Sequence, residues 1–140
     1  MKTRFFFILC TLLLLLVLAA CGTGNTTKTA NSVQVTEKEY TIASSRTSFS
    51  PGTTYHFVVT NNGMTAHEFM IMPKSEGIMS GMPMSHMDKL ALAAIDNINP
   101  GETKTLDYTF PSAAANSQPE FACYLPGHYE AGMKYGVMVK

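Results

Sequence analysis

Residues 121–133 read Phe121-Ala122-Cys123-Tyr124-Leu125-Pro126-Gly127-His128-Tyr129-Glu130-Ala131-Gly132-Met133, and they form the most informative segment of the chain. Four residues separate Cys123 from His128, and another four separate His128 from Met133. The aromatic start favours a strand that ends near Cys123, and Pro126-Gly127 favours a turn that brings His128 back towards it. The stretch predicts one loop that carries a thiolate, an imidazole and a thioether.

A metal site built on these three donors needs a fourth ligand, which we expect from another part of the chain. His67 stands at the start of a predicted strand, after the turn Asn61-Asn62-Gly63. His56 is the rival, but it lies in mid-strand, where a solvent-facing or packed histidine is commoner. Two histidines and one cysteine with a weak axial methionine are the ligands of blue-copper electron-transfer sites. We therefore predict one type 1 copper ion per chain, with the ligands His67, Cys123, His128 and Met133.

The N-terminus has the layout of an export signal. Lys2 and Arg4 precede an apolar run, and Leu18-Ala19-Ala20-Cys21 resembles a bacterial lipobox. The resemblance implies cleavage before Cys21 and attachment of lipid to its thiol, with an uncleaved anchor as the alternative. We expect a signal peptide at residues 1–20, a lipidated flexible tether at 21–32 and a domain at 33–140. This domain would lie outside the cytoplasm, anchored by lipid to the bacterial cell membrane.

The cysteine content supports metal binding. Cys10 leaves with the signal peptide and Cys21 is used for lipid, so Cys123 is the one remaining thiol. Exported proteins usually form disulfides, and an unpaired thiol there needs a reason, such as metal coordination. Removal of residues 1–20 leaves 8 basic and 10 acidic residues, a net charge of −2. Without a basic patch, nucleic acid is not an expected partner.

Short runs of β-branched and aromatic residues alternate with Pro, Gly and Asn turns along the rest of the chain. This pattern predicts an all-β domain, a sandwich or a barrel. The candidate strands are residues 33–36, 40–42, 54–60, 66–72, 103–110, 121–124 and 135–139. One inserted helix is expected, with Ser85 as its N-cap and Pro100-Gly101 as its end. Its apolar stripe consists of Met87, Leu90, Ala91, Ala94, Ile95 and Ile98.

On these residues, the sequence from about Val33 to Lys140 resembles the cupredoxin family. Its Cys-x4-His-x4-Met loop is similar to that of rusticyanin, sulfocyanin and related small cupredoxins, and His67-Glu68-Phe69 resembles the first ligand with its strand. The resemblance implies a Greek-key β-sandwich with copper near one end and His128 near the surface as the electron port. The apolar docking patch around that port would consist of Tyr124, Leu125, Pro126, Tyr129 and Ala131.

Six of the ten methionines lie between Met70 and Met87. Met87 fits the helical stripe, and Met70 and Met72 fit a strand, so packing accounts for these three. A candidate second site for Cu(I) remains, because soft thioethers on a flexible loop favour this ion. Its residues are Met79, Met82, Met84 and His86. The alternative is that these residues cap the sandwich.

The ligand set excludes several classes of protein. A binuclear copper centre or a Cys2His2 zinc site needs two thiolates, and a multicopper oxidase needs more than the four histidines present. Nucleophilic catalysis by Cys123 leaves Met133 unexplained, so we do not expect an enzyme. The first hypothesis is a monomeric one-electron carrier whose partner is a redox protein such as a cytochrome or terminal oxidase. A copper chaperone or storage lipoprotein that uses the Met-rich loop, and a structural domain without turnover, remain as alternatives.

Overall fold

The computed structural model describes residues 30–74 and 82–140, except for the side chains of Met84 and Ser85. The predicted signal peptide, Cys21 and Met79 lie outside the described residues, as does nearly all of the predicted tether. Within the described ranges, no helix is long and apolar enough to cross a bilayer.

The described part of the chain is built mainly from short strands. The strands are β1 (Ser32–Lys38), β2 (Thr41–Ser44), β3 (Ser48–Phe49), β4 (Thr54–Asn61), β5 (His67–Met72), β6 (Ala93–Ile98), β7 (Thr103–Thr109), β8 (Glu120–Ala122), β9 (Lys134–Gly136) and β10 (Met138–Val139). The helix α2 (Met84–Leu90) follows β5, and the short 3-10 helix η1 (Ser112–Ala114) follows β7.

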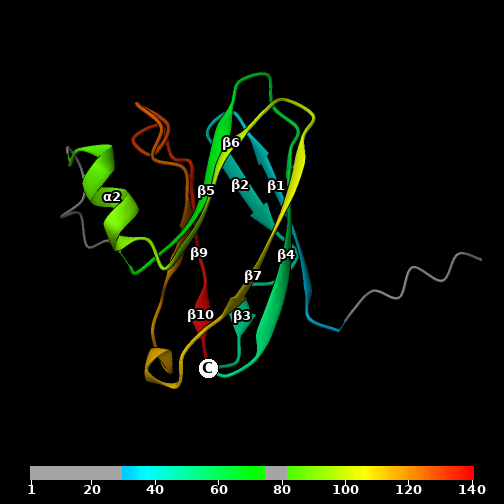
Figure 1. Cartoon of the computed structure of the whole chain (residues 1–140), viewed down its shortest axis with the longest axis vertical. Coiled ribbons are helices and arrows are strands. Elements are labelled where there is room, and N and C mark those ends of the chain that lie inside the picture. Colours follow the sequence, from blue (N-terminus) through cyan, green and yellow to red (C-terminus); the bar gives the residue numbers. More distant parts are fainter. Residues whose placement is uncertain (1–29, 75–81) are drawn as a thin grey trace, which may run out of the picture.

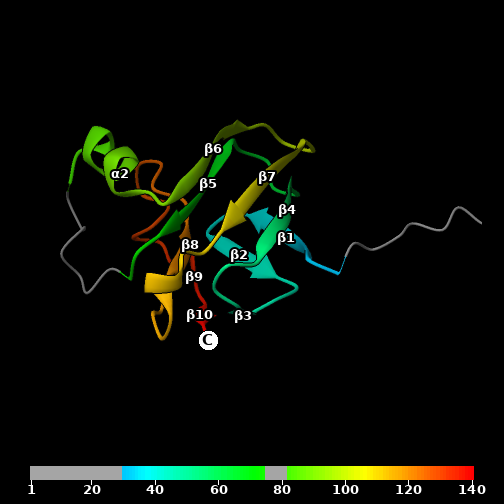
Figure 2. The same ribbon diagram turned by 60° about the horizontal axis from the view of Figure 1, so that its bottom comes forward.

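The strands form a two-layer sandwich (Figures 1 and 2). One sheet has the order β2-β1-β4-β7 and the other the order β6-β5-β8-β9, while β10 pairs with β3 near the C-terminus. The β1–β4 and β10–β3 pairs are parallel and the others are antiparallel. The predicted fold class, an all-β Greek-key sandwich with one inserted helix, is confirmed.

Aromatic side chains from both sheets meet in the core. Along β4, buried positions alternate with partly exposed ones, as expected for a strand with one face in the core. The Phe57 ring on β4 lies 5.6 Å from Phe121 on β8 and 5.9 Å from Phe69 on β5, measured between centroids. These contacts hold the sheet of β4 against the sheet of β5 and β8, which carries the ligand-bearing segments.

Strand β5 is buried on both faces. Its inward side chains, Phe69 and Ile71, join the main core, whereas Met70 and Met72 join a second cluster on the outer face. Helix α2 covers that outer face through Met87. The helix therefore gives the central strand of this sheet a second apolar layer.

The predicted extent of the helix is wrong. Helix α2 ends at Leu90, and residues 93–98 form strand β6 against β5. The register shifts between His67 and Phe69, so that Ile95 and Ile98 both face inward although they are three residues apart. A β-bulge of this kind produces a helix-like spacing within a strand. The N-cap is also Pro83 rather than Ser85, and it makes no side-chain cap bond.

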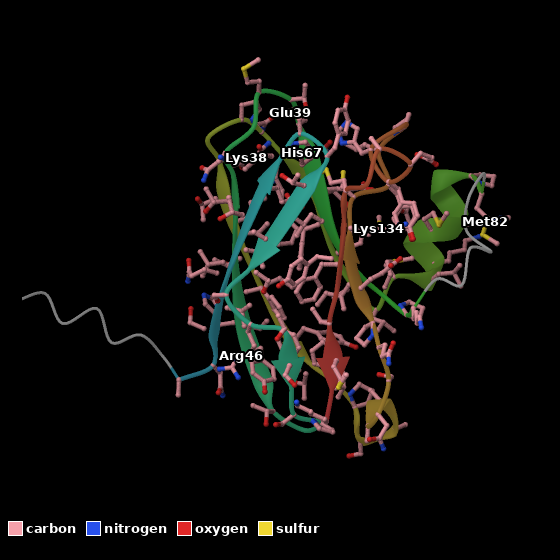
Figure 3. The ribbon with its side chains drawn as sticks, turned by 180° about the vertical axis from the view of Figure 1, so that it is seen from behind. Lys38, Glu39, Arg46, His67, Met82 and Lys134 are labelled. Atoms are coloured by element: carbon pink, nitrogen blue, oxygen red, sulfur yellow. The ribbon has the colours of Figure 1, made fainter. Side chains whose placement is uncertain are left out.

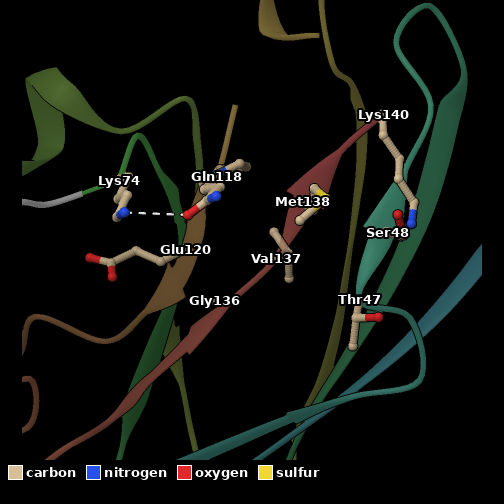
Figure 4. A pocket seen from close by; sticks show the side chains of 10 residues that line it. Thr47, Ser48, Lys74, Gln118, Glu120, Gly136, Val137, Met138 and Lys140 are labelled. Atoms are coloured by element: carbon tan, nitrogen blue, oxygen red, sulfur yellow. Dashed lines mark hydrogen bonds between the residues drawn. The ribbon is translucent and has the colours of Figure 1, made fainter. Parts of the chain in front are cut away.

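An open groove of about 470 Å³ lies on the molecule between β8–β9 and β3–β10 (Figure 4). Lys74, Gln118 and Lys140 are among its lining residues, and Lys74 Nζ donates a hydrogen bond to Gln118 Oε1 at 3.3 Å. The groove includes none of the predicted copper ligands.

Candidate metal centre

His67, Cys123 and His128 meet at one end of the sandwich. One donor atom from each of them lies within 4.8 Å of the other two. His128 Nδ1 is 3.4 Å from Cys123 Sγ and 3.3 Å from His67 Nδ1. Figure 3 shows His67 at this end, next to Glu39. The structure thus brings His67 of β5 together with Cys123 and His128 of the C-terminal loop, which is more than 50 residues away in the sequence.

Backbone hydrogen bonds close the C-terminal loop around the site. The Cys123 N–H donates to the Met133 carbonyl at 3.1 Å, and the Met133 N–H donates to the His128 carbonyl at 3.0 Å. Gly127, at the turn, has a φ of +82°, which a glycine adopts without strain. Met133 is fully buried and belongs to the same apolar cluster as Cys123. Its role as the axial ligand stays a prediction.

The Cys123 thiol is fully buried. Burial raises its pKa to about 11, and the nearby carboxyls of Glu68 and Glu37 act in the same direction. Hydrogen bonds from the backbone N–H groups of Glu68 and Leu125 oppose this rise, because they stabilise the thiolate. The site therefore holds a protonated thiol at neutral pH, with two donors already placed for the thiolate that a metal ion would stabilise.

The His67 imidazole is buried and uncharged. Burial lowers its pKa, and His128 lowers it further, while Glu39 raises it. A neutral imidazole offers a lone pair to a metal ion. Within the described part, its Nε2 atom has no hydrogen-bond partner, and Glu39 Oε1 lies 4.0 Å away.

The donor set fits a copper ion. Two Nδ1 atoms that face each other at 3.3 Å leave room for one shared proton or one shared cation, and the Cys123 thiol faces the same point. Two imidazoles, one thiolate and a buried thioether are donors that suit both copper oxidation states. The walls around them are apolar, which keeps water away from the sulfur.

His128 is partly exposed, unlike His67 and Cys123. Its ring contacts the half-exposed Tyr40 edge-on, with the centroids 5.6 Å apart. The predicted docking patch is wrong in two members. Tyr124 and Tyr129 are buried in the second cluster, which packs under α2 and contains Met70, Met72 and Met87. Pro126 and Ala131 are exposed, and Leu125 is partly exposed.

The two buried tyrosines form a stacked pair behind the loop. Their ring centroids are 4.4 Å apart with an interplanar angle of 10°. The hydroxyl groups of Tyr124 and Tyr129 hydrogen-bond with Glu120 Oε1 at 3.2 Å and 2.9 Å. The Tyr124 N–H donates to Glu68 Oε1 at 2.8 Å. Each tyrosine directly follows a predicted ligand, so these contacts restrain the loop at Cys123 and at His128.

The other predicted residues lie apart from this centre. His56, on β4, is solvent-exposed and its Nδ1 lies 2.6 Å from Asp107 Oδ1 on β7. Met82 is partly buried against the cluster under α2, and His86 is exposed on the helix. Met79 and the Met84 side chain lie outside the described residues, so the second site in its predicted form stays a prediction.

Two residues at the site have no signal in the sequence. Glu39 lies in the turn after β1 and accepts hydrogen bonds from the backbone N–H groups of Met64 and Thr65. Gly63 lies so close to Glu39 and His67 that a Cβ atom there would meet both. Both contacts join segments about 25 residues apart, which only the folded structure brings together.

No family model matches the chain. The chain is 35% identical over 85 residues to the copper-resistant cuproprotein CopI of Vibrio cholerae, a match that covers 59% of this chain and 48% of the relative. It is 34% identical over 95 residues to that of Rubrivivax gelatinosus, covering 64% and 53%. The chain thus spans about half the length of these curated relatives.

Solved structures show the fold. Auracyanin from Roseiflexus castenholzii superposes with a TM-score of 0.62 at 20% identity, over 79% of this chain and 98% of that one. An azurin from Methylomonas sp. strain J gives 0.58 at 19% identity, over 79% and 98%. The chain has the cupredoxin fold, which confirms the resemblance drawn from its sequence.

Proposed function

We propose that this chain is a mononuclear type 1 copper protein that carries one electron at a time. The convergence of His67, Cys123 and His128 donor atoms within 4.8 Å is the observation that carries the proposal. Copper held there would exchange one electron by cycling between Cu(I) and Cu(II). The CopI relatives are named as cuproproteins, which supports the choice of metal.

The burial pattern supports an electron-transfer role. Cys123, His67 and Met133 are fully buried, and His128 is the partly exposed member of the set. Buried ligands with locked neighbours keep the same positions in both oxidation states, which lowers the barrier to electron transfer. His128 then offers the shortest route from the centre to a docked redox protein, such as a cytochrome or terminal oxidase.

The first test is the visible spectrum of the purified protein with Cu(II). We expect an intense band from charge transfer between the Cys123 thiolate and copper. Cys123→Ser should abolish this band, whereas His56→Gln should leave it unchanged because His56 lies on β4 in the other sheet, beside Asp107. A colourless copper-loaded protein would reject the type 1 site.

Copper delivery or storage is the second candidate function, because the relatives are named for copper resistance. An electron carrier gives up an electron and keeps its copper, whereas a copper chaperone gives up the copper ion itself. Rapid reduction of a cytochrome by the Cu(I) form supports the carrier, and transfer of copper to a metal-free acceptor supports the chaperone. Both measurements use the same preparation, so their rates can be compared directly.

We also propose that the protein is exported and held at the outer face of the cell membrane. The apolar segment and Leu18-Ala19-Ala20-Cys21 support this location. Mass spectrometry of the protein from bacterial membranes should find lipid on Cys21 as the first residue. Cys21→Ala should release the protein from the membrane fraction, and a Cys21→Ala protein that stays there would contradict the proposal.

A further inference from the structure

Methionine is segregated within the fold. The main core contains 17 buried residues, and Met133 is its one methionine. The smaller cluster under α2 contains six buried residues, of which Met70, Met72 and Met87 are methionines, and Met82 packs against it. This cluster has no Leu, Ile, Val or Phe among these members. Buried methionine is thus concentrated on one side of this sheet.

The four methionines come from three segments that meet on the outer face of β5. Met70 and Met72 point outward from alternate positions of this strand, and both are fully buried. Met87 lies in α2, and its side chain is only 2% exposed. Met82 lies just before the helix and is partly exposed, and Figure 3 shows it at the outer edge beside α2. Three buried thioethers thus lie beneath one that reaches solvent.

Packing alone explains this composition poorly. A helix that covers a sheet is specified best by Leu, Ile and Val, because methionine has three rotatable bonds and defines its neighbours less well. The cluster also includes the flat, stacked rings of Tyr124 and Tyr129, which need no flexible filler on their outer edge. The property that the four side chains share is their soft sulfur.

We propose that Met70, Met72, Met82 and Met87 form a second metal site, selective for Cu(I). Thioether sulfurs favour Cu(I), whereas Cu(II) also needs nitrogen or oxygen donors, which these side chains lack. The exposed edge of Met82 provides the entry point for the ion. This site shares Met82 with the sequence-based candidate and differs from it by using two methionines from β5 that the sequence assigned to packing.

The site adjoins the type 1 centre. Ala122 and Tyr124, the neighbours of Cys123 in the chain, belong to the Met-rich cluster, while Cys123 itself belongs to the main core. The two sites therefore lie on opposite sides of one strand end. A Cu(I) ion bound under α2 is a second ion per chain and does not depend on the electron-carrier proposal.

The test is a Cu(I) titration under anaerobic conditions in competition with a chromophoric Cu(I) chelator. We expect two Cu(I) ions per wild-type chain and one in the Met72→Leu/Met82→Leu/Met87→Leu variant. The matched control, Met64→Leu/Met138→Leu, changes two exposed methionines outside the cluster and should keep two ions. Retention of the visible Cu(II) band in both variants shows that the fold and the type 1 centre are intact.

A second measurement separates the two sites. The Cys123→Ser/His67→Gln/His128→Gln chain, which lacks three donors of the type 1 centre, should bind one Cu(I) whose X-ray absorption shows sulfur neighbours only. Met82→Leu alone should weaken this binding. This readout stays valid if the triple methionine variant does not fold or if the type 1 proposal fails. Unchanged Cu(I) binding in the Met72→Leu/Met82→Leu/Met87→Leu variant, equal losses in the control, or no sulfur-coordinated Cu(I) in the chain without the three type 1 donors would each overturn the Cu(I) site.

Discussion

Glu39 Oε1 lies 4.0 Å from His67 Nε2, and the same oxygen accepts the backbone N–H groups of Met64 and Thr65. The Met64 N–H is the main reason that the pKa of Glu39 falls to about 2, so the carboxyl is ionised at neutral pH. A carboxylate behind a histidine ligand fixes its ring and strengthens its nitrogen as a donor. At 4.0 Å the two atoms are not hydrogen-bonded, so we predict that Glu39 positions His67 through the attraction of its nearby charge.

Glu39→Gln should raise the reduction potential of the copper centre. The variant removes the negative charge that favours Cu(II), and changes of this kind weaken metal binding by about 10- to 100-fold. Spectroelectrochemical titration measures the potential directly. Glu130→Gln is the charge-matched control, since Glu130 is an exposed carboxylate in the ligand loop. Equal shifts in the two variants would assign the effect to net charge and remove the positioning role.

Gly63→Ala should disturb the centre without a change in charge. A Cβ atom at Gly63 would lie 2.6 Å from Glu39 Oε1, 2.9 Å from His67 Nε2 and 3.0 Å from Asn61 Oδ1. Overpacking of this kind typically costs about 1–3 kcal/mol, which we expect as lower stability and an altered visible band. The control is Gly136→Ala, where a Cβ atom would meet nothing within 4 Å. A Gly63→Ala protein with unchanged spectrum and stability would contradict this steric role.

We predict that the free energy of unfolding falls as the pH rises, because of the buried carboxyl of Glu37. Burial raises the pKa of this carboxyl from 4.5 to about 8, and Glu68 contributes further. Between these two values the folded state binds more protons than the unfolded state, so its stability is greatest at low pH and declines towards pH 8. At about 1.36 kcal/mol per pKa unit, the loss is on the order of 4 kcal/mol.

Chemical denaturation at pH 5 and pH 8 measures this effect of Glu37. Glu37→Gln has no proton to lose there, so its stability should change much less between the two pH values. The wild type and the variant should also be closest in stability at the lower pH. Parallel pH profiles for the two proteins would show that Glu37 is ionised throughout.

Binding of copper should release the proton of Cys123. Burial raises the pKa of this thiol to about 11, so at neutral pH the thiol is protonated and the metal must displace that proton. The affinity for copper should therefore rise about tenfold per pH unit from this group alone. Titration in weak buffer with a pH indicator measures the release, and Met133→Leu should release the same amount. An affinity independent of pH would mean that the thiolate exists before the metal binds.

The sequence was sufficient for the parts of the molecule that follow local rules. A run of aromatic and β-branched residues marked β4, and turn residues bounded the strands around it. The loop from Cys123 to Met133 was predictable because three donors and their turn lie within 11 consecutive residues. Strand β6 was missed because the bulge opposite His67 gave Ile95 and Ile98 a helical spacing.

Other features depend on contacts between distant segments, which no local pattern encodes. The contact of Glu39 with the segment before His67 is one example, and the steric demand at Gly63 is another. The burial of Tyr124 and Tyr129 follows from the position of α2, whose length was itself overestimated. Met70 and Met72 fitted a strand, but no local pattern indicated that their outer face meets Met82 and Met87.

The stacked pair of Tyr124 and Tyr129 has a consequence for loop design. The pair joins the residue after Cys123 to the residue after His128, so it fixes the distance that the segment between them must span. Insertion or deletion of one residue at Pro126 would displace one ring relative to the other. The two hydroxyl groups could then no longer both hydrogen-bond with Glu120 Oε1. Grafts that exchange this loop for one of another length should therefore carry both tyrosines and Glu120 along, as a single transferable unit.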